Sequence, residues 1–212
     1  MYNNLAMSSK NIIKNYQLIP PIITKLRQEN KKIVLTQGTF DMIHIGHGRY
    51  FTKAKSYGDV LFVGVDSDKK VKARKGPDRP VVPEDERLEM VKYLNSVDYA
   101  VLKPLETRKW QLIKLIKPDV LIATARTYTA TQIKQLEKIC GQVVVLSPQA
   151  TTSTSAKLRR LQIGFAKNFS HILTTRIIKT VDELVLELKK QTQTAWPLFL
   201  PTFQSSTKGI LS

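Results

Sequence analysis

The chain has 212 residues, of which 42% are hydrophobic and 24% are charged, and these values exclude a collagen-like chain and a wholly disordered one. The length is enough for one ordinary domain, or for one domain with an appendage. Lys and Arg number 34 against 17 Asp and Glu, so the formal net charge is +17, which favours polyanions or phosphorylated molecules as partners.

Cysteine content and hydropathy indicate the compartment. The single cysteine, Cys140, excludes an internal disulfide framework and a cysteine-based zinc cage, and we expect it to be a small buried residue. No stretch approaches the ~20 apolar residues of a membrane span, and the N-terminus lacks the apolar core of a secretory signal. We therefore expect a cytoplasmic protein with no membrane partner.

The first region, residues 1–31, is expected to be an N-terminal helical extension. It begins polar, and the proline pair at Pro20 ends any helix that precedes it. The apolar residues between Ile22 and Leu26 then indicate a short amphipathic helix.

The second region, residues 32–163, alternates short apolar runs with segments of helical spacing. The apolar runs cover 33–35, 60–65, 99–102, 120–123 and 143–146. The helical segments cover 50–57, 83–94, 110–116 and 131–139. Apolar runs without polar alternation are typical of strands covered on both faces, so the pattern predicts an α/β fold: a doubly wound, five-stranded parallel, Rossmann-like sheet. Ligands of such sheets bind outside the carboxyl ends of the strands.

The third region, residues 164–212, is expected to be a helical C-terminal appendage with an extended tail. Residues 181–188 have the spacing of an amphipathic helix. The tail from residue 191 is rich in Thr, Ser and Gln, and prolines at 197 and 201 forbid a continuous helix. We expect either a docking segment or a disordered end.

The densest chemical signal is the segment 36–47, Thr-Gln-Gly-Thr-Phe-Asp-Met-Ile-His-Ile-Gly-His, between the first strand and the first helix. Gly38 and Thr39 allow a tight turn, and a helix start supplies inward N–H groups for a phosphate. His44 and His47 can face one side of the first turn and donate to phosphate oxygens. The alternatives are a solvated helix cap or a metal pair. We expect no metal on protein side chains, because the only other histidine is His171.

At this point the sequence resembles a known family. The Gly-Thr-Phe-Asp and His-Ile-Gly-His strings are similar to those of the nucleotidyltransferase superfamily that includes glycerol-3-phosphate cytidylyltransferase. The string Lys-Gly-Pro-Asp-Arg-Pro at 75–80 looks most like the heptose-phosphate adenylyltransferase branch. The resemblance covers about residues 31–161.

The resemblance implies roles for individual residues. It implies that His44, His47, Lys75 and Arg87 are catalytic. It implies that the nucleotide is bound by Gly38, Thr39, Phe40, Asp41, Gly46, Asp66, Ser153, Thr154 and Ser155. The hydroxyls at 153–155 also suit a helix cap. It implies an acceptor site at Arg126 and Tyr128, although arginine stands at 126 where relatives usually carry an acidic residue.

The activity that the resemblance implies is the transfer of the nucleoside monophosphate of ATP or CTP to a phosphorylated small molecule, a sugar 1-phosphate or an alcohol phosphate. The resemblance also implies that pyrophosphate is released, that Mg²⁺ accompanies the triphosphate, and that the enzyme is a homodimer. One alternative is a nucleic-acid-binding or regulatory protein that has the same nucleotidyltransferase-like fold but does not turn over a substrate. Another is an aminoacyl-adenylate-forming module, whose second, lysine-rich signature is absent.

Overall fold

The computed structural model describes residues 11–125, 127–150 and 154–195, apart from the side chains of 154–158 and 192–195. The chain divides into two compact units, Met1–Lys157 and Leu158–Ser212. The expected tail from 196 onward lies outside the described residues.

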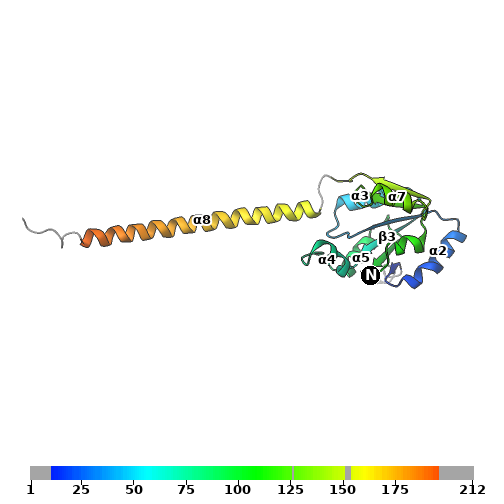
Figure 1. Cartoon of the computed structure of the whole chain (residues 1–212), viewed down its shortest axis with the longest axis horizontal. Helices are drawn as coiled ribbons and strands as arrows, with labels where there is room; N and C mark the ends of the chain where they lie inside the picture. The colour runs from blue at the N-terminus through cyan, green and yellow to red at the C-terminus, as the bar shows by residue number, and fades with distance from the viewer. Residues whose placement is uncertain (1–10, 126, 151–153, 196–212) are drawn as a thin grey trace, which may run out of the picture. The chain divides into compact units, whose positions relative to one another are not determined.

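The first unit alternates strands with helices (Figure 1). The strands are β1 (Ile12–Ile13), β2 (Ile33–Gly38), β3 (Val60–Asp66), β4 (Tyr99–Lys103), β5 (Val120–Thr124) and β6 (Gln142–Leu146). The helices are η1 (Tyr16–Leu18), α2 (Ile19–Gln28), α3 (Ile45–Lys55), α4 (Asp68–Lys75), α5 (Glu84–Lys92), α6 (Gln111–Ile116) and α7 (Ala130–Leu136). Helix α8 (Thr154–Ala195) follows them.

The strands form one parallel sheet in the order β1-β4-β3-β2-β5-β6, which confirms the α/β, doubly wound class. The predicted number of strands was wrong, because β1 adds a sixth strand by pairing Ile12 and Ile13 with Ala100 and Val101. A strand of two residues is too short to leave an apolar run in the sequence.

The segment before residue 32 is part of the first unit and is not only helical. Besides β1, it contributes Ile19 and Leu26, which are buried in the core. Arg27 of α2 donates from Nη1 to both carboxylate oxygens of Asp119 at 2.8 and 2.6 Å. The N-terminal segment is therefore bound to the sheet by apolar burial and by an ion pair.

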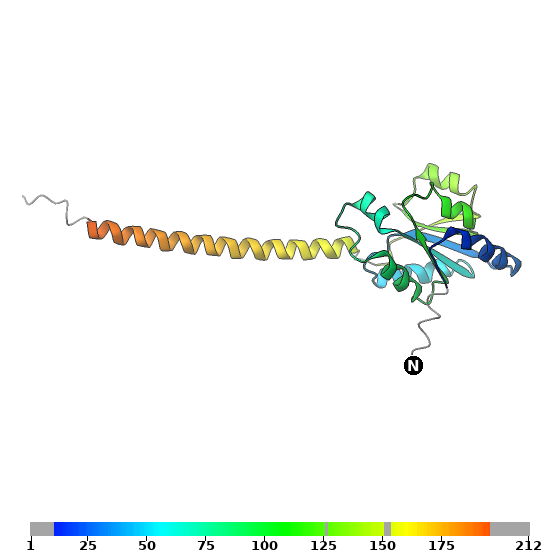
Figure 2. The same ribbon diagram turned by 90° about the horizontal axis from the view of Figure 1, so that it is seen from below.

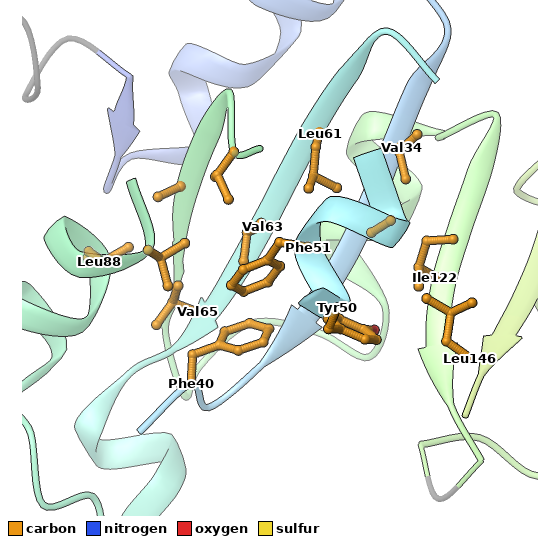
Figure 3. Close-up of a cluster of buried hydrophobic side chains, with 14 of the residues drawn as sticks. Val34, Phe40, Tyr50, Phe51, Leu61, Val63, Val65, Leu88, Ile122 and Leu146 are labelled. Carbon is orange, nitrogen blue, oxygen red and sulfur yellow. The ribbon is translucent and has the colours of Figure 1, made fainter. Parts of the chain in front are cut away.

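Helices cover both faces of the sheet, as expected from its uninterrupted apolar strands (Figure 2). Helices α3 and α5 pack on one face, where Phe51 and Leu88 join strand residues such as Val63 (Figure 3). Helices α2, α6 and α7 pack on the other face, where Cys140 is buried as expected. Alternate residues of β2 enter the two clusters, with Val34 in the first and Leu35 in the second.

Two segments differ from the sequence-based expectation in their secondary structure. Residues 68–75 lie between the expected strand 60–65 and the expected helix 83–94, where no helix was predicted, but they form α4, whose first turn is capped by the Ser67 side chain accepting from the Lys70 N–H. The expected helix at 181–188 is part of the much longer α8, which runs through the predicted boundary at 163.

Candidate active site

The turn after β2 is shaped by a close contact between Gly38 and Phe40. A Cβ on Gly38 would lie 2.9 Å from Phe40 Cζ, so only glycine fits beneath the ring. Phe40 itself has a positive φ of 50°, an uncommon conformation for a bulky residue. Its ring is held by Phe51, with centroids 4.9 Å apart (Figure 3). This packing fixes the path of the backbone from the sheet into α3.

The two motif histidines form the N-terminal cap of α3. His44 Nδ1 accepts a hydrogen bond from the Gly46 N–H at 3.1 Å, and His47 Nδ1 accepts one from the His44 N–H at 3.3 Å. The ring centroids lie 4.1 Å apart. Because both Nδ1 atoms are acceptors, each neutral imidazole carries its proton on Nε2. The cap interpretation and the phosphate-donor interpretation are therefore compatible, because they use different ring nitrogens.

A segment distant in the sequence lies against this motif. A Cβ on Gly46 would be 2.8 Å from the Cβ of Ala150 and 2.8 Å from His44 Cε1. Residue 150 lies three positions before Ser153, the first of the hydroxyl-bearing residues that the resemblance assigns to the nucleotide. Ser153 lies outside the described residues, and Thr154 and Ser155 begin α8 without described side chains. The described chain thus leads to these residues from a position in contact with the histidine motif.

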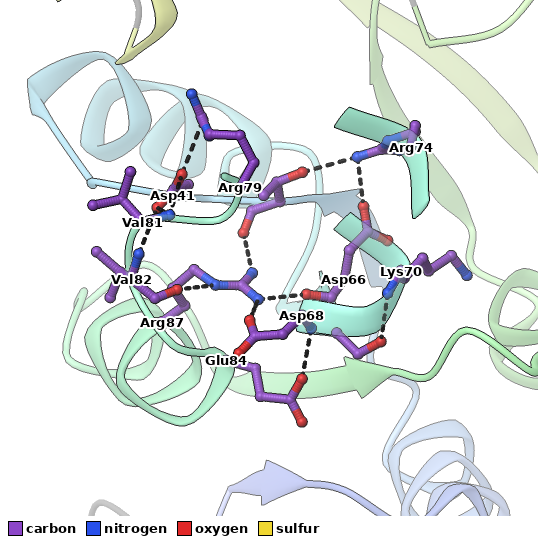
Figure 4. A network of polar contacts seen from close by, with 12 residues as sticks. Asp41, Asp66, Asp68, Lys70, Arg74, Arg79, Val81, Val82, Glu84 and Arg87 are labelled. Atoms are coloured by element: carbon purple, nitrogen blue, oxygen red, sulfur yellow. Dashed lines mark hydrogen bonds and ion pairs between the residues drawn. The ribbon is translucent and has the colours of Figure 1, made fainter. Parts of the chain in front are cut away.

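Arg87 lies at the centre of a buried hydrogen-bond network (Figure 4). Its side chain is 1% exposed. The guanidinium donates to the carbonyl oxygens of Val82, Thr39 and Asp66 and to the Asp68 carboxylate. The arginine therefore connects α5 to the loop after β2, the end of β3 and the start of α4. These four acceptors all belong to the protein itself.

Asp66, at the carboxyl end of β3, holds two cationic side chains. Its Oδ2 accepts from Arg74 Nη2 at 2.9 Å and its Oδ1 accepts from Lys103 Nζ at 3.0 Å. Arg74 Nη2 also donates to Thr39 Oγ1 at 2.8 Å. The Asp66 side chain is 1% exposed, so its charge is neutralised by partners rather than by water.

Asp41 has a similar arrangement on the other side of the turn. Its carboxylate accepts from the N–H groups of Val81 and Val82 and pairs with Arg79 Nη2 at 2.9 Å (Figure 4). The resemblance assigns Asp41 and Asp66 to nucleotide binding. In the structure, each carboxylate pairs with an arginine: Asp41 with Arg79, and Asp66 with Arg74.

Lys75 ends α4 within this concentration of positive charge. Desolvation lowers the pKa of its ammonium below the ordinary value, and the charges of Arg74 and Arg79 lower it further, while Asp41 and Asp66 act in the opposite sense. An anion bound beside these side chains would relieve their mutual repulsion.

Sequence reasoning missed Lys103, whose ammonium is largely buried. Desolvation lowers its pKa, and the neighbouring Asp66 opposes that shift. Its position in the sequence could have indicated it. Lys103 directly follows the apolar run 99–102, so it lies at the carboxyl end of a strand, where ligands of such sheets bind.

On the other side of β2, Tyr128 reaches the end of the strand. Gln37 Nε2 donates to Tyr128 Oη at 3.4 Å, and burial raises the pKa of Tyr128 to about 12. Its predicted companion Arg126 lies outside the described residues.

A cavity of about 360 Å³ lies between the turn after β2 and α5. Apolar residues including Met42 and Met90 line it, together with Glu86, Glu89 and Arg87, whose guanidinium is bonded to the protein. This lining disfavours a phosphate, so the cavity is not assigned to the triphosphate. Within the described residues, no group of three or more His, Cys, Asp or Glu side chains could hold a metal ion.

A family comparison agrees with this geometry. The sequence model of the cytidylyltransferase-like family matches residues 35–193, three quarters of the chain. The chain belongs to the cytidylyltransferase-like family. The predicted membership of a nucleotidyltransferase superfamily is therefore confirmed.

Curated relatives with the name Bifunctional protein HldE are similar to part of the chain. The protein of Aliarcobacter butzleri is 45% identical over 115 residues, which are 54% of this chain and 24% of the relative. The protein of Sulfurimonas denitrificans is 37% identical over 152 residues, which are 69% of this chain and 31% of the relative. The chain thus spans between about a quarter and a third of the length of these relatives.

Two solved structures are similar over part of the chain. The lipopolysaccharide core biosynthesis protein of Thermoplasma volcanium has a TM-score of 0.49 and 28% identity, and covers 56% of this chain and 98% of its own. Pantoate-beta-alanine ligase of Francisella tularensis has a TM-score of 0.48 and 20% identity, and the match covers 64% of this chain and 66% of the ligase chain. Likeness at these scores carries no functional argument.

Proposed function

We propose that the chain transfers the nucleoside monophosphate of ATP or CTP to the phosphate of a small metabolite. An acceptor phosphate oxygen forms a bond to the α-phosphorus, the bond from that phosphorus to the bridging β-oxygen breaks, and pyrophosphate leaves. The acceptor phosphate is already ionised, so the reaction needs no general base. Positioning and charge neutralisation supply the catalysis.

The observation that carries the proposal is the contact of Gly46 with Ala150 beside the two histidines. It supports a single pocket in which the start of α3 and the hydroxyl-bearing segment 153–155 hold the same nucleotide. In that pocket, the Nε2–H groups of His44 and His47 donate to α-phosphoryl oxygens as negative charge accumulates on them. The backbone at Thr39 and Phe40, with Ser153, Thr154 and Ser155, holds the rest of the triphosphate.

Lys75 supplies mobile positive charge to the reacting phosphates, as the resemblance implies. Arg74 and Lys103 add positive charge at the same edge of the sheet, held in place by Asp66. We assign Arg87 a positioning role, in place of direct neutralisation, because its guanidinium is buried and bonded to the protein.

The carboxylates of the site, Asp41 and Asp66, fit a metal ion that arrives bound to the nucleotide. Asp41 and Asp66 are both paired with cations, so they suit the orientation of phosphate-binding groups better than the coordination of a resident ion. Mg²⁺ bound to the triphosphate reduces the charge that the protein has to neutralise.

The acceptor is a sugar 1-phosphate or an alcohol phosphate, with Arg126 and Tyr128 in its site. The recurrence of Bifunctional protein HldE among the relatives supports the sugar phosphate. A homodimer remains part of the proposal, as the resemblance implies.

The test is a pyrophosphate-release screen of the full chain with ATP or CTP and Mg²⁺ against sugar 1-phosphates, glycerol 3-phosphate and phosphocholine. We expect acceptor-dependent release with one nucleotide and a nucleotide-linked product by mass spectrometry. Salt-sensitive DNA or RNA binding without pyrophosphate release from any combination would contradict the proposal and favour the nucleic-acid-binding alternative.

A further inference from the structure

Helix α8 has an exposed apolar stripe along its first half. Leu161, Phe165, Phe169, Ile172 and Leu173 recur at spacings of three and four residues, which place them on one face. All five are exposed, and Phe165 is 74% exposed. Two phenylalanines among them make the stripe unusual for a water-facing surface.

The same part of α8 is positively charged. Residues 159–180, called here the basic segment, contain Arg159, Arg160, Lys167, Arg176 and Lys179 and no acidic residue. At 100° per residue, Arg160 and Lys167 lie on the side opposite the stripe, and Arg159 lies beside its edge. Arg176 and Lys179 lie on the same face as the stripe, after its last apolar residue. The basic segment thus combines one apolar face with an excess of positive charge, in which Lys179 pairs with Glu183 just beyond the segment, 3.9 Å away.

The second half of α8 has a different character. Its apolar residues, which include Ile177, Val181 and Leu184, form a stripe rotated by roughly 140° from the first at 100° per residue. Acidic residues appear only here in α8, at Asp182, Glu183 and Glu187.

This change of face argues against a second copy of the chain as the occupant. A continuous two-stranded coiled coil requires an apolar seam that stays on one side of the helix. Parallel pairing of two basic segments would also bring like charges together without acidic partners. Nucleic acid matches the charge but leaves the phenylalanines without an apolar environment.

We propose that the basic segment binds peripherally to a lipid bilayer that contains anionic lipids. The apolar stripe enters the boundary between headgroups and acyl chains, and the Lys and Arg side chains reach the lipid phosphates. The expectation of no membrane partner rested on the lack of a spanning segment, and a helix that lies in the bilayer surface needs none. Among the described residues, no helix is long and apolar enough to cross a membrane.

The test is co-sedimentation of the full chain with vesicles of phosphatidylcholine alone or of phosphatidylcholine with phosphatidylglycerol. We expect binding to the anionic vesicles, weaker binding as salt is raised, and little binding to phosphatidylcholine alone. Lys167→Ala with Arg176→Ala and Lys179→Ala should weaken partitioning roughly 100-fold.

Serine substitutions on the two stripes of α8 test whether membrane binding depends on the first stripe or on the hydrophobicity of the helix in general. Phe165→Ser with Phe169→Ser should weaken partitioning into anionic vesicles by roughly 100-fold. The matched control is Val181→Ser with Leu184→Ser, on the other stripe, which should bind as the wild type does. Pyrophosphate release should be unchanged in both pairs, so failure of the membrane proposal is distinguishable from failure of the proposed activity.

Three outcomes would overturn the proposal. One is equal binding to neutral and anionic vesicles, or none to either. A second is equal loss of binding in the two serine pairs. The third is a dimer, seen by sedimentation without lipid, that the phenylalanine substitutions convert to monomer, which would make a second copy the occupant of the stripe.

Discussion

At the scale of single residues, the two motif histidines combine a structural and a chemical task. Each ring accepts a backbone hydrogen bond at Nδ1, which leaves Nε2 as its protonated nitrogen. We expect His44→Ala to lower kcat by about 10²-fold or more, because one donor to the α-phosphoryl group is lost. Loss of the cap bond should lower the free energy of unfolding by only about 1 kcal/mol.

The measurement is pyrophosphate release under saturating substrate, with urea denaturation alongside it. His171→Ala is the matched control, since this histidine is exposed on α8. A near wild-type kcat for His44→Ala would exclude the donor role.

A second prediction at this scale concerns Arg87. Arg87→Ala removes the donor from the Asp68 carboxylate and from three carbonyl oxygens, two of which are in buried hydrogen bonds. We expect the free energy of unfolding to fall by about 3 kcal/mol or more, measured by urea denaturation. Arg49→Ala, at an exposed position on α3, should change it by less than about 0.5 kcal/mol.

Arg87→Lys distinguishes positioning from charge neutralisation. Lysine keeps the positive charge but has no planar fork with which to reach four oxygens. Both stability and kcat should therefore remain low in this variant. Full recovery of kcat by lysine would show that the charge alone matters.

At the scale of elements, the site depends on the contact between the start of α3 and the chain that follows β6. Gly46→Ala would place a Cβ 2.8 Å from both Ala150 Cβ and His44 Cε1, so the ring or the neighbouring segment has to move. We expect kcat to fall by on the order of 10–100-fold, because small displacements of catalytic groups are costly.

Gly48→Ala provides the control on the same helix. A Cβ there meets no atom within 4 Å. The substitution should leave kcat unchanged and raise the free energy of unfolding by about 0.5–1 kcal/mol, because alanine favours the helix. Equal kcat values for the two variants would show that the contact at Gly46 does not shape the site.

The elements also show how far the sequence alone could lead. Apolar runs predicted β2 to β6 because strands buried on both faces need side chains of one kind. Helix α4 was missed because its only buried residue is Val71, so eight residues carry no apolar periodicity. The motif located the histidines, but nothing in it could reveal that Arg87 lies buried, since that depends on Thr39, Asp66 and Val82 converging from three other segments.

At the scale of the whole molecule, the two units differ in what stabilises them. The sheet unit buries apolar side chains on both faces of β2 and β3. Every described side chain from 159 to 191 is exposed, so this part of α8 gains little from burial. Its helix depends on backbone hydrogen bonds and on weak surface pairs such as Lys179–Glu183, 3.9 Å apart.

Local stability should therefore be unequal along the chain. In dilute protein without lipid, we expect the amides of 159–191 to exchange with deuterium much faster than those of β2 and β3, because opening the helix exposes far less buried apolar surface than opening the sheet does. Hydrogen-exchange mass spectrometry resolves the two regions. Anionic vesicles should slow exchange in 159–180, while phosphatidylcholine vesicles should leave it unchanged. If α8 exchanged as slowly as β3 without lipid, and did so at every protein concentration, the separate stability of the two units would be wrong.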